Sequence, residues 1–124
     1  MIRQIKAESF SGQYHQIPVF DVRSPSEYAR GHVPGAINLP LFTDEERAMV
    51  GTLYKNTGRF ESILQGIESA GPKLKSFVEA AIEAAPEKKI IVYCWRGGMR
   101  SGSMAWLLDL AGFNVRVLTG GYKA

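Results

Sequence analysis

Residues 89–101 read Lys-Ile-Ile-Val-Tyr-Cys-Trp-Arg-Gly-Gly-Met-Arg-Ser. The first six of these residues are almost continuously apolar, which is typical of a strand buried on both faces of a parallel sheet. A glycine-containing loop follows, and the pattern after it predicts a helix from about Arg100 to Ala111. This helix is apolar nearly all round, including Trp106, so we expect it to be buried in the core.

Strands and helices alternate along the rest of the chain. Runs of β-branched and aromatic residues predict further strands at residues 17–22, 36–39 and 115–118. Two capping boxes, which begin at Ser24 and Thr43, predict the starts of two helices, and further helices are expected before residue 87. The alternation predicts an α/β fold with a central, mostly parallel sheet and helices on both faces. In such a sheet, ligands bind at the carboxyl ends of the strands.

Length and composition limit the function classes. The chain has 124 residues, of which 45% are hydrophobic and 22% charged, as is ordinary for one globular domain. No apolar run approaches the roughly 18 residues of a membrane span, and no apolar block typical of a secretory signal follows the N-terminus. The single cysteine, Cys94, excludes an internal disulfide framework and a cysteine-only zinc site. We therefore expect a cytoplasmic protein that has no membrane partner and needs neither a metal nor another cofactor.

The charge is unevenly distributed along the chain. Residues 1–62 hold seven basic and seven acidic residues, whereas residues 88–124 hold six basic residues and one acidic residue. A solvated basic surface explains this excess, and so does a site for an anionic substrate or a nucleic acid. The net charge of +3 alone leaves both explanations open.

The loop after the buried strand has the composition of an anion-binding site. Cys94 ends the strand and a helix begins six residues later, so backbone N–H groups and the helix dipole converge on one point. The two glycines permit a tight curl, and the two arginines add positive charge. These features favour a thiolate and an incoming oxyanion. We predict Cys94 as the nucleophile, with an anion-binding loop that consists of Trp95, Arg96, Gly97, Gly98, Met99, Arg100 and Ser101.

Other interpretations of this loop exist. A buried, inert cysteine is the simplest, but it needs neither the glycines nor the arginines. Gly97 and Gly102 imitate a Walker loop, which is excluded because the Lys-Ser/Thr pair of that motif is missing. The five residues between Cys94 and Arg100 match the spacing of cysteine-dependent phosphatases, so a cradle for a tetrahedral dianion stays open.

A second informative stretch, residues 21–40, reads Asp-Val-Arg-Ser-Pro-Ser-Glu-Tyr-Ala-Arg-Gly-His-Val-Pro-Gly-Ala-Ile-Asn-Leu-Pro. Together with the Cys94 loop it resembles the rhodanese domain, whose hallmark is Asp-x-Arg, then Glu-Tyr/Phe, then Gly-His-x-Pro-Gly-Ala. The resemblance implies a three-layer α/β sandwich. It also implies that the cysteine carries sulfur as a persulfide or, in some members, selenium.

Residues 41–47, 50–55, 94–103 and 120–124 are further similar to the N-terminal part of the tRNA 2-selenouridine synthases. Those enzymes replace the sulfur of a tRNA 2-thiouridine by selenium from selenophosphate, through a geranylated intermediate, and pair a rhodanese domain with a downstream P-loop domain. The resemblance therefore implies that residues 1–124 are a single rhodanese domain, the N-terminal fragment of a longer enzyme. It also implies that tRNA is the final acceptor only with the help of the second domain.

The loop after Cys94 is one residue longer than the six-residue cradle of common rhodaneses, as it also is in phosphatases with the rhodanese fold. Its length therefore fits selenophosphate or a phosphoester better than thiosulfate as the physiological anion. We favour sulfur or selenium transfer through a Cys94 persulfide or perselenide. The alternatives are a cysteine-dependent phosphatase or arsenate reductase, and a non-catalytic docking module, against which the intact cysteine and arginines argue.

Three residues outside the loop are expected to support the site. Asp21 and Arg23 lie where a strand ends, and a structural ion pair that fixes the turn into the next helix is favoured there over a catalytic role. His32 follows a glycine and is expected to be a hydrogen-bonded turn residue rather than a general base. For Trp95, shielding of the thiolate, stacking on a base and simple packing stay open.

Overall fold

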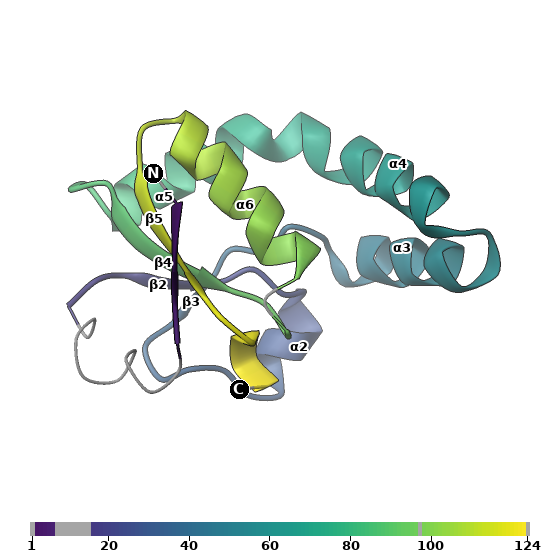
Figure 1. The fold of residues 1–124 in the computed structure, drawn as a ribbon, viewed down its shortest axis with the longest axis horizontal. Coiled ribbons are helices and arrows are strands. Elements are labelled where there is room, and N and C mark those ends of the chain that lie inside the picture. Colours follow the sequence, from purple (N-terminus) through teal and green to yellow (C-terminus); the bar gives the residue numbers. More distant parts are fainter. Residues whose placement is uncertain (1, 7–15, 97, 124) are drawn as a thin grey trace.

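A five-stranded parallel sheet forms the centre of the fold (Figure 1). The computed structural model describes residues 2–6, 16–96 and 98–123. The strand order is β1-β5-β4-β2-β3. The strands are β1 (Ile2–Ile5), β2 (Val19–Asp21), β3 (Ile37–Asn38), β4 (Lys89–Tyr93) and β5 (Asn114–Leu118). The strand predicted over residues 89–94 is β4, at the centre of the sheet. It ends one residue before Cys94, and its last four residues are fully buried.

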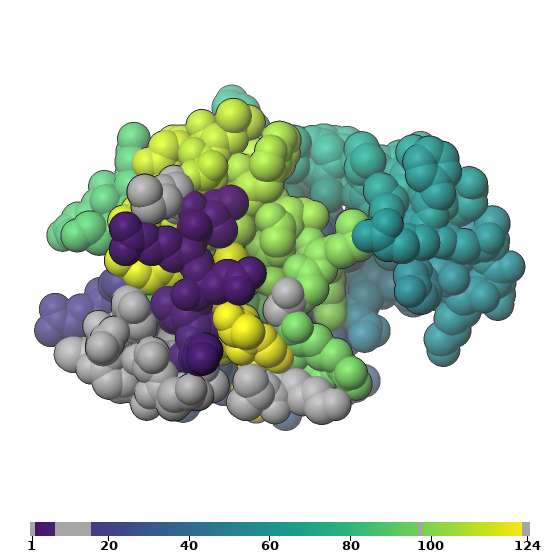
Figure 2. Space-filling model, in the orientation of Figure 1, coloured from purple at the N-terminus to yellow at the C-terminus, as the bar shows by residue number. Residues whose placement is uncertain are grey.

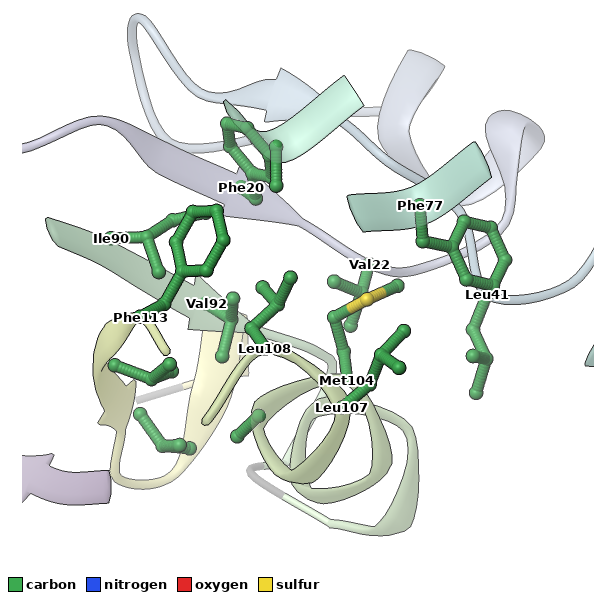
Figure 3. Close-up of a cluster of buried hydrophobic side chains, with 14 of the residues drawn as sticks. Phe20, Val22, Leu41, Phe77, Ile90, Val92, Met104, Leu107, Leu108 and Phe113 are labelled. Atoms are coloured by element: carbon green, nitrogen blue, oxygen red, sulfur yellow. The ribbon is translucent and has the colours of Figure 1, made fainter. Parts of the chain in front are cut away.

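Helices cover both faces of this sheet, which confirms the predicted α/β class. They are α2 (Pro25–Ala29), α3 (Asp44–Asn56), α4 (Arg59–Ala70), α5 (Leu74–Ala84) and α6 (Met99–Leu110), with short 3-10 turns η1 (Gly71–Lys73) and η2 (Gly121–Lys123). On one face, side chains of α5 and α6 pack on the sheet, as Figure 3 shows for Phe77, Met104 and Leu108. On the other face, Tyr28 of α2 and Tyr122 of η2 pack against a smaller cluster.

The two predicted capping boxes begin helices α2 and α3. The Ser24 N–H donates to the Glu27 carboxylate at 3.1 Å. The Thr43 N–H donates to Glu46 at 2.9 Å, and the Glu46 N–H returns a bond to the Thr43 hydroxyl at 3.1 Å. Each box satisfies donors that the first turn of a helix cannot pair internally, so the local sequence alone is sufficient to fix where these helices begin.

Strand β1 was not predicted from the sequence, which indicated no strand at the start of the chain. It pairs with β5 in the register Ile2 to Val115, and only Ile5 of its four residues is buried. An edge strand with a single buried side chain shows neither apolar alternation nor an apolar run. It is therefore held mainly by backbone hydrogen bonds that the sequence pattern does not report. Strands β2 and β3 are shorter than the predicted ranges 17–22 and 36–39.

The prediction that α6 is buried on all sides, with Trp106 in the core, is wrong. Trp106 is 58% exposed and Leu110 is 70% exposed, whereas Met104 and Leu108 are fully buried. The sheet contacts one side of α6 only, and the other side faces outward. Apolar composition therefore overstated the burial of this helix.

Helices α3 and α4 form a hairpin that projects from the sheet to one side (Figures 1 and 2). A groove of about 1250 Å³ lies between this hairpin and α6, and Val50, Ile67 and Trp106 are among its lining residues. Apolar side chains of the two helices line the groove or face outward, as Phe60 does with 67% exposure, while Val50 also packs against the core. In the described parts of the chain, no helix has the length and hydropathy of a membrane span.

Leu108 and Leu110 allow the two sides of α6 to be compared by mutation. Replacing the fully buried Leu108 by alanine is expected to lower the free energy of unfolding by about 2–5 kcal/mol, because the cavity it leaves cannot fully collapse. Leu110→Ala is expected to change it by about 0.5 kcal/mol or less. Urea denaturation of both variants measures the difference. Equal losses would show that α6 packs on the sheet with a different side.

Candidate active site

Cys94 lies directly after β4, at the carboxyl end of the central strand, and is 3% exposed. Its Sγ accepts a hydrogen bond from the Gly98 N–H at 3.3 Å. The thiol donates to the Ser101 hydroxyl at 3.2 Å, and that hydroxyl donates to the Gly98 carbonyl at 3.2 Å. Gly98 is the N-cap of α6, so the sulfur lies at the positive end of that helix. The chain thus brings two other predicted residues, Gly98 and Ser101, into contact with the Cys94 sulfur.

Three of the other predicted loop residues have exposed side chains. Trp95, Arg96 and Met99 are exposed, and the Arg96 side chain makes no ion pair with another described residue. Gly97 lies outside the described residues. Three of the predicted loop side chains are therefore exposed, next to a buried sulfur atom.

Arg100 has a partner that the sequence did not predict. Its Nη1 donates to the Glu27 carboxylate at 2.6 Å and its side chain is only 19% exposed. The positive charge that Arg100 adds to the loop is therefore paired with a carboxylate. The signal that could have found Glu27 is topological, because it follows β2, the neighbour of β4, and the carboxyl ends of adjacent parallel strands lie at one edge.

Glu27 accepts hydrogen bonds from Ser24 and Arg100 and also forms an ion pair with Arg47. Besides Arg100 of α6, it accepts from the backbone and hydroxyl of Ser24 at 3.1 and 3.0 Å, and Arg47 of α3 lies 3.0 Å from it. Burial alone would raise the pKa of Glu27, but the hydrogen bonds and charge of Arg100, together with Ser24, lower it to about 2. Glu27 is therefore a carboxylate at neutral pH.

Asp21 and Arg23 form the expected ion pair beneath the site. Arg23 Nη2 lies 2.6 Å from Asp21 Oδ2, and both side chains are at most 3% exposed. The Tyr93 hydroxyl donates to the same Asp21 oxygen at 2.8 Å, and Arg23 also donates to the Gly31 carbonyl at 2.7 Å. Burial and the neighbouring Asp21 raise the pKa of Tyr93. This network ties β2 and β4 to the end of α2.

His32 is a hydrogen-bonded turn residue. Its Nδ1 lies 2.8 Å from the Tyr28 carbonyl and its ring stacks on the Tyr28 ring with centroids 3.6 Å apart. No described contact joins His32 to Cys94. In the described part of the chain, no three His, Cys, Asp or Glu side chains gather as metal ligands would.

The C-terminal turn η2 contacts the backbone of Cys94. This contact was not predicted from the sequence. The Tyr122 N–H donates to the Cys94 carbonyl at 2.7 Å, and the Arg23 guanidinium lies 4.4 Å from the centre of the Tyr122 ring. Gly121 has a φ of +63°, and a Cβ there would lie 2.2 Å from the Cys94 carbonyl oxygen. Only glycine permits this close approach.

Gly121→Ala is expected to lower the free energy of unfolding by about 1–3 kcal/mol more than Gly35→Ala. Gly35 has a φ of +82° but open space around it, so its alanine variant carries the backbone strain without the clash. Chemical denaturation of both variants measures the difference. Similar losses would show that the contact between η2 and Cys94 relaxes at little cost.

Comparison with known proteins places this chain in a family. Residues 2–124 match the Rhodanese-like domain. The chain belongs to the rhodanese-like family. It is similar to the tRNA 2-selenouridine synthase of Bdellovibrio bacteriovorus, with 42% identity over 99% of this chain and 33% of the relative.

Solved structures of other proteins share the fold of this chain. One is the N-terminal domain of a Clostridium difficile 630 protein named for ATP/GTP binding, with a TM-score of 0.87 and 42% identity over 96% of this chain and 92% of that one. Another is a human single-domain sulfurtransferase, which at 18% identity and a TM-score of 0.57 shares the fold over 97% of this chain and 91% of that one. This rhodanese-like chain spans about a third of the length of the curated relatives it matches.

Proposed function

We propose that the chain transfers sulfur or selenium through Cys94, which carries the atom as a persulfide or perselenide. The observation that carries this proposal is the Gly98 N–H on the Cys94 sulfur at the N-terminus of α6. A backbone donor and a helix N-terminus favour a negatively charged sulfur, both as the attacking thiolate and as the terminal atom of a persulfide. Membership of the rhodanese-like family supports the same chemistry.

The transfer step balances with thiosulfate as a donor. The Cys94 thiolate attacks the outer sulfur, a sulfur–sulfur bond to Cys94 forms, the bond within thiosulfate breaks, and sulfite leaves with the electron pair. Selenosulfate would load selenium in the same way. With selenophosphate, attack on selenium would release phosphite, whereas loss of the phosphoryl group to water would release phosphate and selenide. The phosphorus product therefore distinguishes a perselenide from direct delivery of selenide.

The acceptor that we propose is the 2-thiouridine of a tRNA, whose sulfur is replaced by selenium in the cytoplasm. Support comes from the relatives named tRNA 2-selenouridine synthase, which are 42–43% identical to nearly the whole chain. Because the chain covers about a third of their length, we propose that it is a single rhodanese domain whose tRNA step depends on a further, nucleotide-binding domain. Cys94 is the one cysteine of the chain, so a persulfide must be passed to an external acceptor.

A panel of anionic reagents tests this proposal. The protein is incubated with thiosulfate, selenosulfate, selenophosphate or p-nitrophenyl phosphate, and bound chalcogen and released product are measured. We expect a chalcogen on the protein from at least the first two, and no turnover of the phosphoester. The spacing between Cys94 and Arg100 favours a phosphatase as the second candidate. Phosphoester turnover without any bound chalcogen would establish that candidate instead.

A further inference from the structure

We infer that Glu27 is a specificity-determining residue, which sets how strongly the Cys94 site attracts an anion by holding Arg100 and Arg47. The inference deepens the proposed function, because it concerns the selection of the anionic donor. Glu27 lies in α2, Arg100 in the first turn of α6 and Arg47 in α3, so one carboxylate joins three elements. Its oxygen lies 2.6 Å from Arg100 and 3.0 Å from Arg47.

The charge of this cluster determines what the site can attract. Two guanidinium groups and one carboxylate have a net charge of +1. This charge lies beside α6, whose N-cap N–H donates to the Cys94 sulfur. The Glu27 side chain is 11% exposed, so solvent screens the pairs only in part. An anion that binds at the N-terminus of α6 must compete with this carboxylate for the N–H groups of Arg100. A dianion competes better than a monoanion because its Coulomb attraction is about twice as large.

Glutamine at position 27 removes the negative charge of the side chain and retains the capping box that begins α2. The third position of a capping box accepts glutamine as well as glutamate, because the side-chain oxygen receives the backbone N–H in both. In the chain this donor is the Ser24 N–H at 3.1 Å. Glu27→Gln should therefore raise the net charge of the cluster to +2 while α2 stays folded.

Glu46→Gln is a matched control. Glu46 also occupies the third position of a capping box, receives the Thr43 N–H at 2.9 Å, and pairs with a cation, Lys73, at 2.6 Å. It belongs to α3 and makes no described contact with Arg100. The same substitution therefore removes a cap charge and an ion pair without changing the partner of Arg100. Lys88→Ala is the control for Arg100→Ala, because it also removes one positive charge. Lys88 is exposed and lies before β4, at the opposite end of that strand from Cys94.

The charge that Cys94 experiences can be measured by alkylation with two reagents. Iodoacetate is a monoanion and iodoacetamide is neutral. The same thiolate attacks the CH2 carbon of both and displaces iodide, so the ratio of the two rates cancels the thiolate fraction and the exposure of the sulfur. We expect Glu27→Gln to raise the ratio of iodoacetate to iodoacetamide by about three- to tenfold at low salt, and high salt to reduce this gain. Arg100→Ala should lower the ratio, and both control variants should stay within about twofold of the wild type.

An unchanged ratio in Glu27→Gln, or an equal rise in Glu46→Gln, would overturn the inference. If the buried thiol reacts too slowly, titration of the Gly98 amide resonance with sulfate supplies the comparison. Because sulfate is a dianion, about ten- to a hundredfold tighter binding is expected in Glu27→Gln. Both measurements report charge without requiring a chalcogen on Cys94. Failure of the proposed function and failure of this inference are therefore separable.

Discussion

Cys94→Ser is expected to lower the transfer of sulfur from thiosulfate to cyanide by at least about 10³-fold, to the background rate. A serine hydroxyl ionises far less readily than a thiol and cannot hold a sulfane sulfur under these conditions. The sulfur of Cys94 also lies where the Gly98 N–H, at 3.3 Å, can stabilise its charged forms. Formation of thiocyanate by wild type and variant measures the effect.

Ser101→Ala is the control within the same site. It removes the hydroxyl that lies 3.2 Å from the Cys94 sulfur and keeps the nucleophile and the Gly98 donor. Loss of one hydrogen bond of about 0.5–1.5 kcal/mol corresponds to a decrease of at most about tenfold. If Cys94→Ser retained a rate within tenfold of the wild type, Cys94 would not carry the sulfur.

Arg23→Met is expected to lower the free energy of unfolding by about 3–5 kcal/mol. The variant keeps an apolar side chain in place but leaves the Asp21 carboxylate buried without its guanidinium partner, which lies 2.6 Å away in the wild type. The Tyr93 hydroxyl and the Arg23 backbone N–H still contact Asp21, so we expect the lower part of this range.

Lys75→Met gives the corresponding measurement at the surface. Lys75 lies 3.9 Å from Glu79, and the two side chains are 88% and 65% exposed. Such a pair contributes about 0–1 kcal/mol. Urea denaturation compares the two variants. An equally small loss in Arg23→Met would mean that the Asp21–Arg23 pair is not needed to hold β2, β4 and α2 together.

The parts of the fold that the sequence predicted are those determined locally. The buried strand before Cys94 and the capping boxes at Ser24 and Thr43 depend on neighbours a few residues away. β1 could not be predicted in this way, because its stability comes from pairing with β5 more than a hundred residues later. The exposure of Trp106 was missed because apolar composition does not say which side of a helix the sheet covers.

The same distinction applies to the candidate site. Cys94, Gly98 and Ser101 lie within one strand–loop–helix unit, so their meeting follows from the local sequence. Glu27 reaches Arg100 across 73 positions of the chain, and Tyr122 reaches Cys94 through the C-terminal turn. Such contacts depend on strand order, which the sequence pattern of a single chain does not determine. The partner of Arg100, and with it the charge of the site, therefore required the structure.

The most direct test of chalcogen transfer is the intact mass of the protein after incubation with thiosulfate and removal of excess reagent. We expect the wild type to gain the mass of one sulfur atom, dithiothreitol to remove it, and Cys94→Ser to gain nothing. A wild-type protein of unchanged mass, in which iodoacetamide still alkylates Cys94, would contradict the account.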